Sequence, residues 1–266
     1  GKKYFFDSSI YENRVYNGIG KPDASVDLKF GPGIVDWPEM APLGEHLLLK
    51  VASVIHDPVT TTDELIPSGE TSSYRSNPLG LAQYTLSRKD PAYVSRAKTI
   101  QAAEQARLKE VLPEELYAVL PELKSVIRSV EERFGCSLSD IEIGSVIYAV
   151  KPGDGSAREQ AASCQKVLGG LANIARDYAT KRYRSNLINW GMLPFLLEEE
   201  LPFDLEDYIF IKDVKKTVAE KGMSFEAYVV TKEMKPFTLT LGELTDDERD
   251  IITKGCLINY YKAAQK

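Results

Sequence analysis

Two apolar runs dominate the pattern of hydrophobic and polar positions along the chain. Residues 47–55 (LLLKVASVI) and 141–150 (IEIGSVIYAV) are bounded by turn residues, which is typical of buried strands. Residues 171–178 predict a further strand. Helical patterns at 157–168 and 181–190 alternate with these runs. The alternation predicts parallel strands joined by crossover helices, and therefore an α/β fold.

The rest of the chain has weaker patterns. Residues 92–134 are helical but interrupted by proline, which predicts two or three short helices, the last ending at Gly135. Residues 207–241 hold short alternating segments that predict antiparallel strands. Residues 245–248 (TDDE) form a capping-box signature for a final helix reaching about Ala264.

The N-terminal part of the chain differs from the other residues in composition. Residues 1–45 are rich in Gly, Pro and Asp and show little periodicity. They predict an extended arm or linker that enters a domain at residues 46–266. Such a start suggests that further domains precede this segment in a longer protein.

Composition narrows the function classes. The 266 residues include 33 Lys+Arg and 39 Asp+Glu, for a net charge of −6. An acidic chain is a poor non-specific binder of nucleic acid, although residues 181–184 (KRYR) form a basic stretch. A solvated helix face is the alternative interpretation of that stretch. No apolar stretch approaches the roughly 20 residues of a membrane span.

The number and spacing of the cysteines indicate which cofactors this chain could bind and which cellular compartment suits it. Cys136, Cys164 and Cys256 are widely spaced, and no CxxC pair occurs. This pattern disfavours a disulfide scaffold and a self-contained zinc or iron–sulfur site. It predicts reduced thiols in a cytoplasmic protein that holds no metal in this chain.

One segment has the composition of an anion-binding turn. Residues 153–160 (GDGSAREQ) lie between a predicted strand and a predicted helix, where glycines allow close approach and free N–H groups favour an anion. Arg158 is suited to hold a carboxylate bidentately. A deprotonated Ser156 would be stabilised in this field as a base or nucleophile. A plain N-cap role for Ser156 is the structural alternative.

Several motifs together resemble the aconitase family. The segments GDGSAREQAASCQKVLGG (153–170) and KRYRSNLINWGMLPF (181–195) are similar to that family's C-terminal swivelling domain. TTDEL (61–65) is similar to the family's T-T-D-H-I segment, and Arg75 falls where the family has an arginine. The final helix also resembles the family's C-terminal end. The likeness covers about residues 46–266.

The resemblance implies a fold and an activity. The fold is a three-layer β/β/α swivelling domain, with a mostly parallel central sheet and a smaller antiparallel sheet. The activity is that of a hydro-lyase (hydratase) acting on a hydroxy-polycarboxylic acid. Ser156 would be the catalytic base, Arg158 and Arg75 would bind substrate carboxylates, and Asp63 would act as an acid/base or orienting group. We expect these groups at the carboxyl ends of the parallel strands.

The chain also departs from the family pattern. Ala157 replaces a second serine, Glu64 replaces the histidine of T-T-D-H, and Ile66 stands where a serine is common. These changes leave open a different hydroxy-polycarboxylate substrate, or a non-catalytic homologue that binds a metabolite or RNA.

The resemblance also implies a cofactor outside this chain. Family members hold a four-iron–four-sulfur cluster through three cysteines, which include a CxxC pair. We therefore expect the cluster in upstream domains of the same protein, so that this chain alone would be inactive. The alternative is a separate small subunit that pairs with a large subunit.

Overall fold

The computed structural model describes residues 3–13, 20–27, 29–109 and 113–265. The chain divides into two compact units, Gly1–Ile34 and Val35–Lys266. In the first unit the described residues are largely irregular, with one short helix, α1 (Ser9–Glu12). The division falls before residue 45, and the interpretation of residues 1–45 as a linker within a longer protein stays a prediction.

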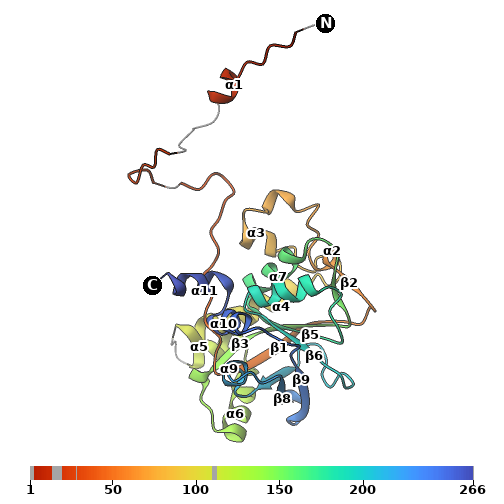
Figure 1. Ribbon diagram of the computed structural model, residues 1–266. Coiled ribbons are helices and arrows are strands. Elements are labelled where there is room, and N and C mark those ends of the chain that lie inside the picture. Colours follow the sequence, from red (N-terminus) through yellow and green to blue (C-terminus); the bar gives the residue numbers. More distant parts are fainter. Residues whose placement is uncertain (1–2, 14–19, 28, 110–112, 266) are drawn as a thin grey trace. The chain divides into compact units, whose positions relative to one another are not determined.

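The second unit is built on one closed, seven-stranded sheet (Figure 1), with the strand order β1-β3-β5-β6-β9-β8-β7. Neighbours among β1, β3, β5 and β6 are parallel, and every pair that involves β7, β8 or β9 is antiparallel. The strands are β1 (His46–Ile55), β3 (Ile141–Ala149), β5 (Gly170–Ala175), β6 (Leu193–Leu196), β7 (Tyr208–Ile211), β8 (Ser224–Val229) and β9 (Lys235–Thr240).

The α/β class is confirmed, and one part of the expected sheet arrangement is wrong. The antiparallel strands are not a separate smaller sheet, because β7 pairs with β1 and β9 pairs with β6, which closes them onto the parallel strands. The small second sheet of the described residues is instead parallel and joins β2 (Thr60–Thr61) to β4 (Pro152–Asp154).

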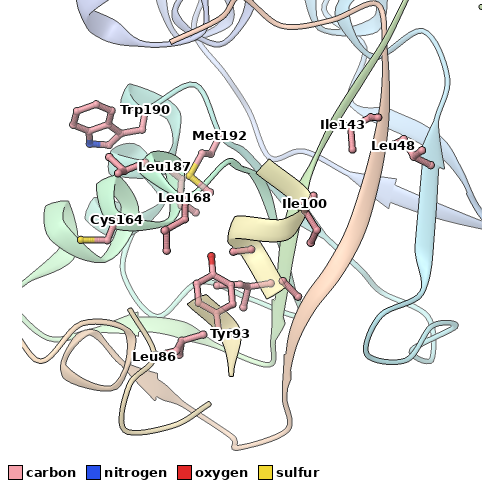
Figure 2. Packing of buried hydrophobic residues seen from close by; sticks show 14 of the residues in the cluster. Leu48, Leu86, Tyr93, Ile100, Ile143, Cys164, Leu168, Leu187, Trp190 and Met192 are labelled. Atoms are coloured by element: carbon pink, nitrogen blue, oxygen red, sulfur yellow. The ribbon is translucent and has the colours of Figure 1, made fainter. Parts of the chain in front are cut away.

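Two hydrophobic cores follow from the alternation of side chains along each strand. In β1, Leu47 and Leu49 pack in a cluster formed largely by side chains of the barrel strands, while Leu48 belongs to a second cluster shared with the helices. Figure 2 shows this second cluster, in which Leu48 and Ile143 lie on neighbouring strands. Burial on both faces explains why β1 and β3 are nearly continuous apolar runs.

The helices of the second unit mostly follow the sequence pattern. Three helices fill residues 92–134 as expected, and Gly135 ends the last with φ +68°. The helical elements are α2 (Thr62–Leu65), η1 (Ser72–Tyr74), α3 (Pro78–Ala82), α4 (Tyr93–Leu108), α5 (Pro113–Val119), α6 (Leu123–Phe134), η2 (Leu138–Asp140), α7 (Arg158–Val167), α8 (Lys181–Asn189), α9 (Val214–Ala219), η3 (Val230–Lys232), α10 (Asp246–Lys254) and α11 (Leu257–Ala264).

The expectation of one continuous C-terminal helix is wrong. The capping box of Thr245 and Glu248 is present, but α10 ends at Gly255, which has φ +92°. A Cβ on Gly255 would lie 2.0 Å from the Ala41 carbonyl oxygen. The close backbone contact and the left-handed conformation therefore both require glycine, and α11 begins as a separate helix.

Candidate functional site

Two loops that are far apart in sequence meet beyond the carboxyl ends of β1 and β3. The short strands β2 and β4 follow these ends and pair in parallel, with Thr60 opposite Pro152 and Thr61 opposite Asp154. The pairing brings the segment that contains Asp63 beside the segment that contains Ser156. Figure 1 shows α2, β2, α3 and α7 gathered at this end of the sheet.

Gly155 sets how closely the two loops approach. It has φ +129°, and a Cβ at this position would lie 2.2 Å from the Thr62 hydroxyl oxygen. Only glycine fits this conformation and this space without displacing α2. The close approach at Gly155 is therefore that of a neighbouring loop of the same chain, and close approach of a ligand stays a prediction.

The first turn of α2 is fixed by a capping box. The Thr61 hydroxyl accepts from the Glu64 N–H at 3.2 Å, and the Glu64 carboxylate accepts from the Thr61 N–H at 2.8 Å. The Thr61 N–H is the main group that lowers the pKa of Glu64. Glu64, where the family has a histidine, thus serves as a structural cap in this chain. Ile66 is fully buried in the core.

Ser156 lies exposed in the turn between β4 and α7. The N-cap residue of α7 is Ala157, whose side chain makes no capping hydrogen bond. The plain N-cap interpretation of Ser156 is therefore wrong. Ser156 stands two residues before Arg158, the first residue of α7.

Arg158 is the first residue of α7. Its Nε atom is buried and has no hydrogen-bond partner among the described residues. A buried guanidinium nitrogen without a partner is costly, and a carboxylate or other anion at this position would satisfy it.

Arg75 reaches the same region from a third segment. It follows η1, and the adjoining helix α3 packs against α7. Arg75 and Glu159 both line a cavity of about 40 Å³ between these helices. Arg75 therefore lies beside α7, the helix whose first residue is Arg158.

Asp63 has a partner that the sequence did not reveal. Its carboxylate forms an ion pair with Arg88, and the second guanidinium nitrogen of Arg88 pairs with Glu70. The hydrogen bond to Glu70 is the largest of the effects that raise the pKa of Arg88. Arg88 thereby links α2 to the segment that leads to Arg75. A single arginine in a polar stretch carries no motif, so only the fold could identify it.

Three buried polar side chains next to the β4–α7 turn form a closed set of hydrogen bonds. Gln165 donates to the Tyr183 hydroxyl at 2.9 Å, Asn173 donates to the Gln165 side-chain oxygen at 2.7 Å, and Tyr183 donates to the Asn173 side-chain oxygen at 2.7 Å. A Cβ on Gly153 would lie 2.4 Å from the Tyr183 ring. The Tyr183 ring therefore limits how closely β4 can approach α8.

The described residues do not suit an iron–sulfur cluster. No group of three or more His, Cys, Asp or Glu side chains among them is arranged to hold a metal ion. The three cysteines are unbridged, and Cys164 and Cys256 are buried.

None of the helices that the structure describes is long and apolar enough to cross a membrane.

Comparisons with known proteins show which proteins this chain is similar to. Residues 142–200 match the model of the aconitase C-terminal domain family. The chain is 32% identical over 118 residues to a homoaconitase small subunit of Thermus thermophilus, covering 44% of this chain and 63% of that protein. It is 33% identical over 123 residues to a methanogen homoaconitase small subunit of Methanocaldococcus jannaschii, covering 46% and 64%. The matches thus span less than two thirds of these relatives.

A solved structure shows the same fold. The crystal structure of 3-isopropylmalate dehydratase from Methanocaldococcus jannaschii superimposes with a TM-score of 0.51 at 22% identity, over 83% of this chain and 95% of that one. The matched family segment runs from β3 through the Ser156 loop, α7, β5 and α8 to just beyond β6. Residues 142–200 are therefore similar to the aconitase C-terminal domain family, in agreement with the resemblance seen in the sequence motifs of this segment.

Proposed function

We propose that this chain is the small subunit of a two-chain hydro-lyase that interconverts a hydroxy-polycarboxylic acid and its unsaturated counterpart. The observation that carries the proposal is the pairing of β2 with β4, which brings the Asp63 segment beside the Ser156 turn just before α7, where the buried Arg158 Nε has no partner among the described residues. The curated relatives named above are small subunits, which favours a separate chain over a piece of a longer one.

The proposal includes the finer description of the fold. The parallel half of the barrel, its antiparallel half and the helices over the parallel half would correspond to the three layers of a swivelling domain. β1, β3, β5 and β6 supply the first, β7 to β9 the second, and α4 and α7 belong to the third. In this arrangement the loops after β1 and β3 are presented together to a partner and a substrate.

The residues at this end suit removal of a proton beside a carboxylate. Ser156, as the alkoxide, would take the proton, and the positive charge of Arg158 together with the N-terminus of α7 would stabilise that alkoxide. Arg158 and Arg75 would each hold a substrate carboxylate with a forked pair of donors. The electron pair of the former C–H bond then forms the C=C bond as the neighbouring C–O bond breaks. The departing hydroxide takes a proton from solvent to leave as water, and Ser156 returns its own proton to solvent.

Asp63 would act mainly by orientation. Its carboxylate is engaged by Arg88, which suits it to the placement of a neighbouring group. The exposed position of the pair leaves it accessible to a substrate or a partner chain.

The proposed partner is a large subunit that holds the iron–sulfur cluster. The described residues of this chain do not form such a site, so none of the steps above is assigned to the cluster. We expect the active site to be complete only when the two chains are assembled.

Turnover by the assembled complex tests the proposal. Ser156→Ala should lower kcat by about 10²–10⁴-fold, because it removes a positioned base, with little change in KM. Ser129→Ala on the surface of α6 is the matched control and should retain full turnover. Unchanged kcat in Ser156→Ala would contradict the assigned base, and a chain that binds no large subunit would contradict the small-subunit role.

A further inference from the structure

A second site lies at the opposite end of α7 from Arg158. A cavity of about 140 Å³ opens there, beside the start of β3 and the last two turns of α4. Its charged lining residues are Glu39, Glu104, Glu142 and Lys166, of which Glu39 is exposed, and Met40, Leu108 and Leu171 supply apolar surface. None of these residues belongs to the hydro-lyase site proposed above.

The charge of Glu104 is compensated within the protein. Both carboxylate oxygens of Glu104 accept from Arg107, at 2.6 and 2.7 Å, and one also accepts from the Ile143 N–H at 2.9 Å. Glu104 therefore has no need of a further partner. Glu39 is exposed and solvated, so the buried charges that remain are those of Glu142 and Lys166.

Glu142 and Lys166 are buried without full compensation. Glu142 is 6% exposed and Lys166 8% exposed, yet among the described residues the one hydrogen bond to the Glu142 carboxylate comes from the Gly44 N–H at 2.7 Å. Across the same described part of the chain, no carboxylate oxygen lies within the 4.0 Å of a salt bridge from the Lys166 ammonium, and that group makes no hydrogen bond. The two opposite charges thus line one cavity without touching each other.

Burial favours the neutral form of both groups. It raises the pKa of Glu142 to about 7 and lowers that of Lys166, although each attracts the other's charge. Each group is therefore driven toward its neutral form in the empty cavity. A ligand that brings the two complementary charges would remove this penalty for both.

We propose that the cavity binds a small aliphatic α-amino acid, whose carboxylate pairs with Lys166 and whose ammonium pairs with Glu142. A zwitterion matches both charges at once, whereas a simple anion would meet the Glu142 carboxylate and a simple cation would meet Lys166. The apolar contacts of Met40, Leu108 and Leu171 suit an aliphatic side chain.

The volume of the cavity limits the ligand. An engineered cavity of about 150 Å³ accommodates benzene, so 140 Å³ admits a side chain and backbone of modest size. L-Valine is of suitable size and is the first probe.

Calorimetric titration of the full 266-residue chain is the direct test. L-Valine should bind saturably and raise Tm by several degrees, because a ligand that binds only the folded state stabilises it. Isovalerate, which lacks the ammonium group, and isobutylamine, which lacks the carboxylate, should each bind at least about tenfold more weakly.

Variants assign the two contacts. Lys166→Met and Glu142→Gln should each weaken valine binding about tenfold or more. Both keep side-chain volume, and replacing a buried charge by an apolar group is often tolerated, so folding can be verified by their own Tm. Lys235→Met, at the exposed first residue of β9, is the control and should bind as the parent does.

Three results would overturn the inference. They are an absence of valine binding, equal binding of valine and isovalerate, and unchanged affinity in folded Lys166→Met. None of these depends on the large subunit or on turnover, so this site can fail while the proposed hydro-lyase function stands.

Discussion

At the scale of single residues, the candidate site depends on one glycine contact. Gly155 combines a positive φ with a neighbour, Thr62, that leaves no room for a methyl group. Gly135 also has a positive φ, but no atom lies within 4 Å of a Cβ placed there. An alanine at Gly135 would therefore meet only the strain of the left-handed backbone, whereas an alanine at Gly155 would also clash with Thr62.

We expect Gly155→Ala to lower the free energy of unfolding by about 2–4 kcal/mol, since strain and overpacking add. Gly135→Ala should cost only about 1–2 kcal/mol, the penalty of the left-handed conformation. Urea unfolding of both variants measures the difference. Equal costs would mean that the loops around Thr62 and Gly155 part easily.

At the scale of elements, Arg88 holds the segments of the site together. It joins Asp63 on α2 to Glu70, which precedes the turn that carries Arg75. Ion pairs this exposed contribute little to stability, about 0–1 kcal/mol. Their effect should therefore appear in substrate binding more than in folding.

Arg88→Ala is expected to leave the free energy of unfolding within about 1 kcal/mol of the parent. In the assembled complex it should raise KM several-fold, because the segment that carries Arg75 loses its anchor, while kcat changes less. Arg128→Ala removes a comparable exposed pair with Glu132 on α6 and serves as the control. A KM equal to that of Arg128→Ala would show that the Arg88 pairs have no role in positioning.

The elements differ in how far local sequence predicts them. The apolar runs located β1 and β3 to within a residue or two, because burial on both faces leaves a strong local signal. The end of α10 at Gly255 depends instead on the backbone of Ala41, more than two hundred residues away. Closure of the barrel likewise rests on long-range pairing, with Leu196 opposite Thr240 between β6 and β9. Neither contact has a local pattern.

The same contrast holds for the candidate site. Ser156 and Arg158 can be selected as candidates from the sequence because a turn between a strand and a helix has a compositional signature, and their roles stay predictions. Arg88 was missed because its importance comes only from its position next to Asp63 and Glu70 in the fold. Glu142 and Lys166 were missed because their burial cannot be inferred from charged residues in an otherwise ordinary strand and helix.

At the scale of the whole molecule, the buried Glu142 links stability to pH. Its pKa of about 7 in the folded state exceeds the ordinary value of 4.5, mainly because burial penalises the carboxylate. Between these two values the folded chain binds more protons than the unfolded chain, so stability falls as pH rises through this window. The charges that bear on Glu142 are Lys166 and Arg107, which favour its ionised form, and Glu104, which opposes it.

Glu142→Gln should remove this contribution while retaining an acceptor for the Gly44 N–H. A pKa rise from 4.5 to about 7 corresponds to about 3 kcal/mol, so the variant should gain about that much relative to the parent between about pH 4 and about pH 8. Denaturant unfolding across this range measures the gain. Glu220→Gln, at an exposed position after α9, should follow the parent at every pH. If the Glu142→Gln and parent curves ran parallel, the Glu142 carboxylate would have to be ionised in the folded chain, and its negative charge would need a partner closer than Lys166 now lies.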